Sequence, residues 1–303
     1  MAIVLISGGT GLIGRALSDA LIKKGHEVRV LSRNPKSTPT IKSYFWNVEQ
    51  GKIDEKAFEG LTHLVHLAGE GIADKRWTVR RQQQIIDSRV NSMKLLERVL
   101  LKHQIKLESF VGASAIGIYG MLTSETIFSE SNNGADDFLS HTCHLWEDAY
   151  ANSSAFSKKT CIIRTGIVLS AKGGALGKLL PFFNAGLGSA IGSGKQYMSW
   201  IHLDDMIRIY EEALFNPKFN TVYNAVSSQH ITNYDFCKAL AKAHHKPYFM
   251  PKVPAFLLKL LYGEMAEMLL TGSRISNQRL VETGFSFKFS DLGKALENLT
   301  KLK

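Results

Sequence analysis

Short apolar runs alternate with longer amphipathic stretches along most of this chain. Seven of the apolar runs have the length of buried strands, and they cover residues 2–6, 27–31, 44–46, 63–67, 109–113, 161–164 and 221–225. Apolar residues recur at helical spacing after residue 12, over 78–102 and over 139–152. This alternation of strands and helices predicts an α/β fold built on a doubly wound parallel sheet of six to seven strands.

The last third of the chain changes character. Helical patterns over residues 232–243 and 255–270 are separated by Pro247, Pro251 and Pro254. They predict a smaller, mostly helical segment beside the main sheet. We therefore expect one domain over residues 1–170, to which residues 201–228 cross back, and a second, substrate-side unit over residues 171–303.

A glycine-rich turn directly follows the first strand, where residues 7–14 read Ser-Gly-Gly-Thr-Gly-Leu-Ile-Gly. Glycines at 8, 11 and 14 allow a tight turn, close approach of a pyrophosphate, and close packing of the next helix. That helix begins with free N–H groups and the positive end of its dipole. Glycine turns also serve purely structural ends, but the flanking strands and helix favour a Rossmann dinucleotide site. Its expected contacts are Gly8, Thr10, Gly11, Leu12, Ile13 and Gly14.

The end of the second strand indicates which coenzyme fits. NAD sites usually carry an acidic residue about 20 positions past the glycines, whereas this chain has Ser32 and Arg33 there. A hydroxyl and a planar cation suit a 2′-phosphate. The sequence therefore favours NADP(H), unless Arg33 is only a solvated loop cation.

Composition narrows the class of protein further. Hydrophobic residues make up 45% of the chain, yet no apolar run is long enough to span a bilayer. The first strand leaves no room for a leader peptide, and three widely separated cysteines fit a reducing cytoplasm. The net charge of +10 could suit nucleic acid or a membrane. However, the basic stretch over residues 75–98 lacks interleaved aromatics, so we expect a solvated helix face and neither of those partners.

Further motifs follow the glycine turn in a fixed order. They are Leu67-Ala68-Gly69, Ser114-Ala115-Ile116-Gly117-Ile118-Tyr119-Gly120, Gly192-Ser193-Gly194 and Trp200-Ile201-His202-Leu203-Asp204-Asp205. In these motifs the chain resembles the extended short-chain dehydrogenase/reductases, the group of nucleotide-sugar epimerases and dehydratases. Residues 253–258, 262–266 and 283–285 resemble the C-terminal domain of its atypical subfamily, the epimerase family proteins. The resemblance adds Ala68 and Gly69 to the coenzyme contacts. Ser114 and Arg164 join them, because ligands bind at the carboxyl ends of strands in open α/β sheets.

The usual catalytic set of that family is missing. The resemblance implies a Ser or Thr after the fifth strand and a Tyr-x-x-x-Lys pair on the next helix, which pass a proton while hydride moves. Here those three positions hold Ala115, Leu139 and Cys143. Tyr-x-x-x-Lys strings do occur at residues 234–238 and 248–252, but both lie far beyond the fifth strand. We interpret them as accidents of composition.

A proton donor would then come from another side chain near the coenzyme. Tyr119 follows the strand whose end underlies the nicotinamide, although it could simply wall the pocket. Cys143 and Glu147 lie on the next helix, where packing or a helix-stabilising ion pair is the alternative role. His141 and His144 have no third ligand at a useful spacing, so we expect no metal.

Substrate contacts are expected from the second half of the chain. Residues 173–178 form a glycine-rich stretch that ends in Lys178, a pattern that suits a lid over an anionic ligand. In relatives, one strand lines the substrate site, and here it is flanked by Gln196, Trp200 and His202. Tyr119 is a further candidate for a substrate contact. The alternative is core packing beside a helix whose N-cap is Asp204.

Two functions from different classes remain open. The first is an NADP(H)-dependent oxidoreductase or epimerase with a relocated proton donor, acting on a small carbonyl or nucleotide-sugar-like substrate. The second is an NADP(H)-binding sensor or scaffold without turnover. By resemblance alone, the helices over residues 78–102 and 139–152 would pair two subunits in a homodimer.

Overall fold

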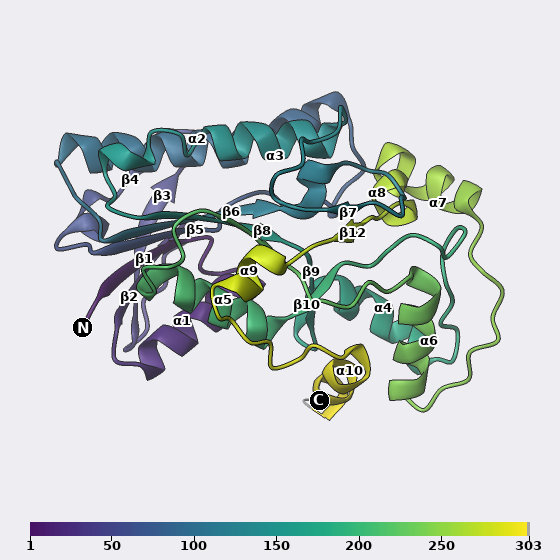
Figure 1. Ribbon diagram of the computed structural model, residues 1–303. Coiled ribbons are helices and arrows are strands. Elements are labelled where there is room, and N and C mark those ends of the chain that lie inside the picture. Colours follow the sequence, from purple (N-terminus) through teal and green to yellow (C-terminus); the bar gives the residue numbers. More distant parts are fainter. Residues whose placement is uncertain (302–303) are drawn as a thin grey trace.

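A single eight-stranded sheet runs through the protein, and the computed structural model describes residues 1–301 (Figure 1). The strand order is β11-β8-β6-β5-β1-β2-β3-β4. The bounds are β1 (Ile3–Ser7), β2 (Glu27–Ser32), β3 (Ile41–Asn47), β4 (Lys52–Ile53), β5 (His63–His66), β6 (Ser109–Ala115), β8 (Thr160–Thr165) and β11 (Val222–Ala225). Every pairing is parallel except that of β3 with β4. The seven expected strands are confirmed, and β4, a two-residue return of the chain, is an eighth that the sequence did not reveal.

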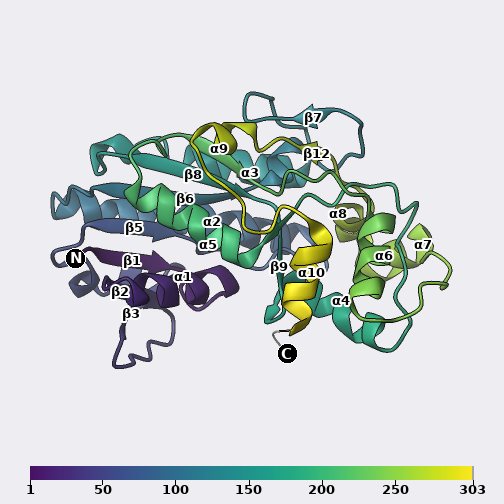
Figure 2. The same cartoon turned by 60° about the horizontal axis from the view of Figure 1, so that its bottom comes forward.

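Helices cover both faces of this sheet, as Figures 1 and 2 show. On one face lie α1 (Leu12–Lys23) and α5 (Leu203–Phe215), and on the other lie α2 (Val79–Lys102) and α3 (Phe138–Asp148). Successive side chains of β1 lie on alternate faces of the sheet: Val4 and Ile6 pack in the core on one face, and Leu5 packs in the core on the other. Both faces of the sheet are therefore shielded from solvent, which explains why the strands read as apolar runs in the sequence.

The remaining elements lie beside the main sheet. They are β9 (Ile167–Ser170) paired with β10 (Trp200–His202), β7 (Ile127–Phe128) paired with β12 (Arg274–Ile275), and the helices α4 (Gly174–Asn184), α6 (Asn233–Ala243), α7 (Ala255–Tyr262), α8 (Ala266–Leu270), α9 (Gln278–Glu282) and α10 (Leu292–Lys301). Of these, β9, β10, α4, α6 and α10 share a core of their own, which we call the core of the second unit, whereas α9 packs in the core of the main sheet. Between β10 and β11 the chain returns to the main sheet through α5.

Two local expectations are wrong. The helix expected over residues 255–270 is broken at Gly263, whose φ of 61° no right-handed helix tolerates. The N-cap of α5 is not Asp204 but His202, whose Nδ1 accepts from the Asp204 N–H at 3.0 Å. By contrast, Thr78 and Thr232 cap α2 and α6 through their hydroxyls, at the positions where the helical patterns begin.

A buried histidine links the stability of this fold to pH. His66 on β5 lies between the Ser7 hydroxyl, 2.5 Å from its Nδ1, and the Ser92 hydroxyl, 3.1 Å from its Nε2. Burial lowers the pKa of His66 from 6.5 to about 4. The unfolded chain therefore binds this proton first, and stability is lost as pH falls from 6.5 towards 4.

We expect His66 alone to remove about 2 kcal/mol of unfolding free energy between pH 7.5 and pH 5. Denaturant titrations at the two pH values measure this loss, which should shrink by that amount in His66→Gln. His141→Gln, which changes an exposed histidine of α3, should leave the loss intact. An unchanged pH dependence in His66→Gln would show that this imidazole does not titrate between the two states.

Candidate functional site

A large cavity opens at the carboxyl ends of β1, β2 and β5. Its volume is about 1040 Å³, and we call it the first cavity. The loops after the three strands supply its wall with Gly8, Thr10, Gly11, Ser32, Arg33, Asn34, Leu67, Ala68, Gly69 and Glu70. Side chains of α2 and of the segment before it close the far side. The strand ends thus bring together most of the residues predicted to contact a dinucleotide.

Glycines bring α1 directly against the turn that precedes it. A Cβ on Gly14 would lie 2.5 Å from the Gly8 carbonyl oxygen, and one on Gly8, whose φ is +72°, would lie 2.8 Å from Leu67 backbone atoms. The helix begins after Gly11 with no side-chain cap and no acidic residue in its first turn. Its first N–H groups, those of Leu12, Ile13 and Gly14 included, are therefore suited to an anion at this end of the cavity.

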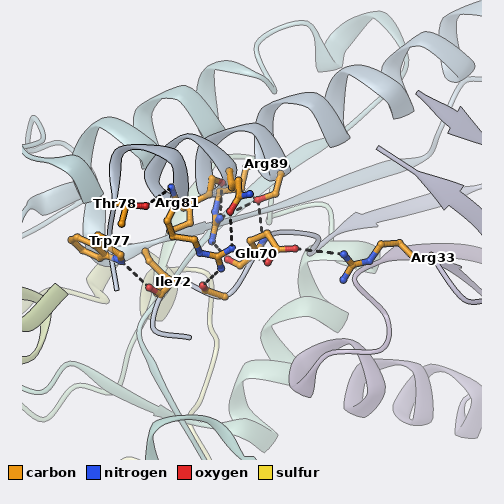
Figure 3. A network of polar contacts seen from close by, with 11 residues as sticks. Arg33, Glu70, Ile72, Trp77, Thr78, Arg81 and Arg89 are labelled. Atoms are coloured by element: carbon orange, nitrogen blue, oxygen red, sulfur yellow. Dashed lines mark hydrogen bonds and ion pairs between the residues drawn. The ribbon is translucent and has the colours of Figure 1, made fainter. Parts of the chain in front are cut away.

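An ion-pair network forms the basic rim of the first cavity (Figure 3). The Glu70 carboxylate accepts from Arg81 at 3.2 Å and lies 3.7 Å from an Arg33 nitrogen. Arg33 is 76% exposed, and the neighbouring Ser32 hydroxyl accepts from the Asn34 N–H. Glu70 was not singled out in the sequence. Its carboxylate partly neutralises Arg33 and Arg81, so an anion that enters this rim would compete with it.

The second cavity, of about 300 Å³, lies at the carboxyl ends of β6 and β8. The three residues that replace the family's catalytic set, Ala115, Leu139 and Cys143, all line it. A Cβ on Gly117 would lie within 3.6 Å of both Leu139 and Cys143, so the helix packs closely on the loop after β6. Burial raises the pKa of Cys143 to about 12, which makes this thiol a poor acid. The far wall comes from Tyr197, Ser199 and the segment from α8 to β12.

The other proton-donor candidates form one hydrogen-bonded group behind β6. Glu147 accepts from the Ser114 hydroxyl at 2.6 Å and from two Arg164 nitrogens at 2.9 Å. A third Arg164 nitrogen donates to the Tyr119 oxygen at 3.0 Å, and Tyr119 donates to Asn224 at 2.8 Å. Tyr119 lines the second cavity, whereas Ser114, Glu147 and Arg164 are not among the residues that line either cavity. The structure therefore places Ser114 and Arg164 away from the first cavity, where Ser114 donates to Glu147 and Arg164 donates to both Glu147 and Tyr119.

The substrate-side residues lie elsewhere than expected. Trp200 is fully buried, and His202 caps α5 and stacks on Phe289 with ring centroids 3.9 Å apart. Gln196 is buried and donates to the carbonyls of Ile191 and Leu269. All three are therefore buried residues, and Trp200 belongs to the core that β10 shares with β9, α4, α6 and α10. Residues 173–178 do not form a free lid, since most of them belong to α4, and Lys178 donates from it to the Ala73 carbonyl at 3.2 Å.

One helix face contradicts the sequence interpretation. Arg81 and Arg89 are buried, although a solvated basic face was expected for this helix. Their spacing of eight, with buried Ile85 midway, is a helical stripe that could have revealed them. Arg89 lines the second cavity and Arg81 the first. Tyr197 and Ser199, next to the expected Gln196 and Trp200, are the wall residues that the sequence missed.

Comparisons with known proteins agree with this geometry. Residues 4–226 match the profile of the NAD dependent epimerase/dehydratase family, and residues 253–299 match a domain of unknown function, DUF1731. The chain belongs to the NAD dependent epimerase/dehydratase family. Within the family, epimerase family protein YfhF of Bacillus subtilis is 34% identical over 98% of this chain and 97% of its own length. Human epimerase family protein SDR39U1 is 35% identical over 98% of this chain and 99% of its own.

A solved structure of the human relative supports the same assignment. Isoform 2 of SDR39U1, crystallised with NADPH, has 32% sequence identity to this chain and a TM-score of 0.86, and 99% of each chain is covered. The UDP-glucuronic acid 4-epimerase of Bacillus cereus, with 18% identity and a TM-score of 0.78, shares the fold. The predicted resemblance to the atypical epimerase family proteins is confirmed. Within residues 1–301, no helix has the length and apolar character needed to cross a membrane, and no three His, Cys, Asp or Glu side chains cluster as metal ligands.

Proposed function

We propose that this protein is an NADP(H)-dependent oxidoreductase or epimerase that acts on a small carbonyl or nucleotide-sugar-like substrate. The observation that carries the proposal is the first cavity, where a glycine turn and an uncapped helix face a basic rim, in a chain 32% identical to a protein crystallised with NADPH. The main-chain N–H groups of residues 8–14 would hold the pyrophosphate. Ser32 and Arg33 would hold the 2′-phosphate, and Ala68 and Gly69 would line the path between.

The two cavities adjoin at one loop. Gly69 and Glu70 line the first, Ile72 lines the second, and Arg89 of α2 donates to the Glu70 carbonyl between them. A dinucleotide in the first cavity can therefore extend into the second. When bound, NADP(H) supplies or accepts the hydride. The chain's own part is to exclude water with apolar walls and to hold a proton at a defined atom.

We propose that Tyr119 holds this proton and donates it to the substrate. It lines the second cavity, and Arg164 donates to its oxygen at 3.0 Å. Burial raises the pKa of Tyr119, while the Arg164 charge acts in the opposite direction and would stabilise the phenolate left after proton transfer. Arg164 thereby takes the part that a lysine plays in the usual family set. A cytoplasmic location and a homodimer through α2 and α3 complete the proposal and rest on composition and resemblance.

A second function has its own support. Ala115, Leu139 and Cys143 offer no usable acid to the second cavity, and both oxygens of Glu147 are already engaged. Such a protein could bind NADP(H) as a sensor or scaffold without turnover. Two assays separate the two functions: loss of NADPH absorbance in the presence of aldehydes or ketones, and conversion of a nucleotide sugar into its epimer with NADP⁺ bound, since epimerisation consumes no coenzyme overall.

We expect turnover with at least one of these classes, and Tyr119→Phe should lower kcat by about 100-fold or more while NADPH affinity stays the same. Tyr223→Phe is the matched control, because this buried tyrosine donates to the Lys218 carbonyl away from both cavities. Tight NADPH binding without turnover across the panel would favour the sensor. Full activity in Tyr119→Phe would assign the proton to another group.

A further inference from the structure

One buried arginine differs from all the others in residues 1–301. Four arginines are buried, and three of them have a carboxylate partner: Arg29 pairs with Glu27 at 2.8 Å, Arg81 with Glu70 at 3.2 Å, and Arg164 with Glu147 at 2.9 Å. Arg89 is 8% exposed and has no ion pair within the described residues. Buried charges are normally paired, because desolvation of a lone ion is costly.

The contacts of Arg89 are all with neutral groups. Its guanidinium donates to the carbonyls of Ile85 at 2.8 Å and Glu70 at 3.2 Å, and weakly to the Ser88 hydroxyl at 3.4 Å. It also lies over the Trp146 ring at 4.8 Å. Figure 3 shows Arg81 and Arg89 reaching from α2 towards the same loop, yet only Arg81 meets the Glu70 carboxylate. The fold thus holds the Arg89 charge firmly in place without neutralising it.

The Arg89 guanidinium lies at the wall of the second cavity. Of the residues that line it, Arg89 alone is charged, and the others are apolar, aromatic, glycine, cysteine or hydroxyl residues. A volume of about 300 Å³ is at the lower end for small-molecule sites. A diphosphate together with a nucleoside and a sugar would need more room and more than one cation. The lining suits a compact apolar body with a single negative group.

We propose that the second cavity binds a small, largely apolar carbonyl compound that carries one carboxylate, and that Arg89 pairs with this carboxylate. The inference rests on the proposed function for the carbonyl group, while the charge and size requirements come from the cavity itself. A planar guanidinium already oriented by two backbone carbonyls can accept a carboxylate with little further ordering.

Two probes of one shape test the proposal. Benzoylformate and acetophenone differ only in that a carboxylate replaces a methyl group, and each is titrated calorimetrically into protein saturated with NADP⁺. We expect benzoylformate to bind at least about 10-fold more tightly than acetophenone. Arg89→Met should abolish this ratio, and Arg89→Lys should keep part of it. Arg98→Met, which changes an arginine of the same helix that lines neither cavity, should leave it unchanged.

Several outcomes overturn the proposal. They are equal binding of the two probes by the wild type, absence of binding by both, and tighter binding of UDP-glucose than of benzoylformate. If Arg89→Met weakens NADPH and benzoylformate binding by the same factor, Arg89 pairs with a coenzyme phosphate and not with a substrate carboxylate. Carboxylate-dependent binding of benzoylformate supports this inference even where the whole substrate panel gives no turnover, a result that would contradict the proposed enzyme alone.

Discussion

Replacing Gly14 with alanine will weaken NADPH binding by about 100-fold or more, or roughly 3 kcal/mol. The new Cβ would lie 2.5 Å from the Gly8 carbonyl oxygen and 2.6 Å from the Gly9 Cα. Both are backbone atoms that cannot rotate away, so α1 must move off the turn. That movement withdraws the N–H groups that we propose face the pyrophosphate.

Gly177→Ala provides the matched control for this effect. Gly177 lies within α4, and a Cβ there meets nothing within 4 Å. Alanine should be neutral or slightly stabilising at this helical position and leave NADPH affinity intact. Calorimetric titration of both variants, with circular dichroism to verify folding, measures the contrast. Wild-type affinity in folded Gly14→Ala would show that the coenzyme does not use this turn.

Replacing Arg33 with alanine will weaken NADPH binding roughly 10–100-fold and leave NADH binding nearly unchanged. The side chain is exposed at the rim of the first cavity, and its nearest anion is Glu70 at 3.7 Å. Only the phosphorylated coenzyme brings an additional anion to this place, so only its affinity depends on the cation. Equal weakening of both coenzymes would mean that Arg33 does not read the 2′-phosphate.

Glu70→Gln is the companion variant, because it removes the competing carboxylate and keeps the side-chain size. We expect it to tighten NADPH binding severalfold, while NADH affinity changes little. Glu49→Gln, which removes another carboxylate from the wall of the same cavity, controls for a general change of charge. If Glu70→Gln weakens NADPH binding, Glu70 supports the site by orienting Arg81 instead of opposing the phosphate.

The sheet was predictable because its signal is local. β1, for example, is buried on both faces and reads as an unbroken apolar run from Ile3 to Ile6. The glycine turn was equally predictable, since a Cβ on Gly8 or on Gly14 would collide with neighbouring backbone atoms. β4 was not, because two residues carry no periodicity. The break of the C-terminal helix at Gly263 depends on one backbone angle within an otherwise helical pattern.

Only part of the site could be predicted, because the burial of a side chain depends on tertiary contacts. The sequence aligned Ala115, Leu139 and Cys143 with the missing catalytic set, and the structure brings them to one cavity. It did not reveal that Arg81 and Arg89 are buried, because charged residues on a helix normally face water. Trp200 and His202 were expected to contact a ligand, yet both are buried: Trp200 lies in the core of the second unit, and His202 stacks on Phe289 of that core. Which face of an element is covered depends on segments far away in the chain.

Direct titration of the purified protein with NADPH and NADH by calorimetry is the most direct test of the proposed coenzyme site. The first cavity predicts a saturable heat with NADPH at one site per chain, and an affinity for NADH that is lower by at least about 10-fold. Absence of heat with NADPH, or tighter binding of NADH, would contradict the proposed function at its foundation.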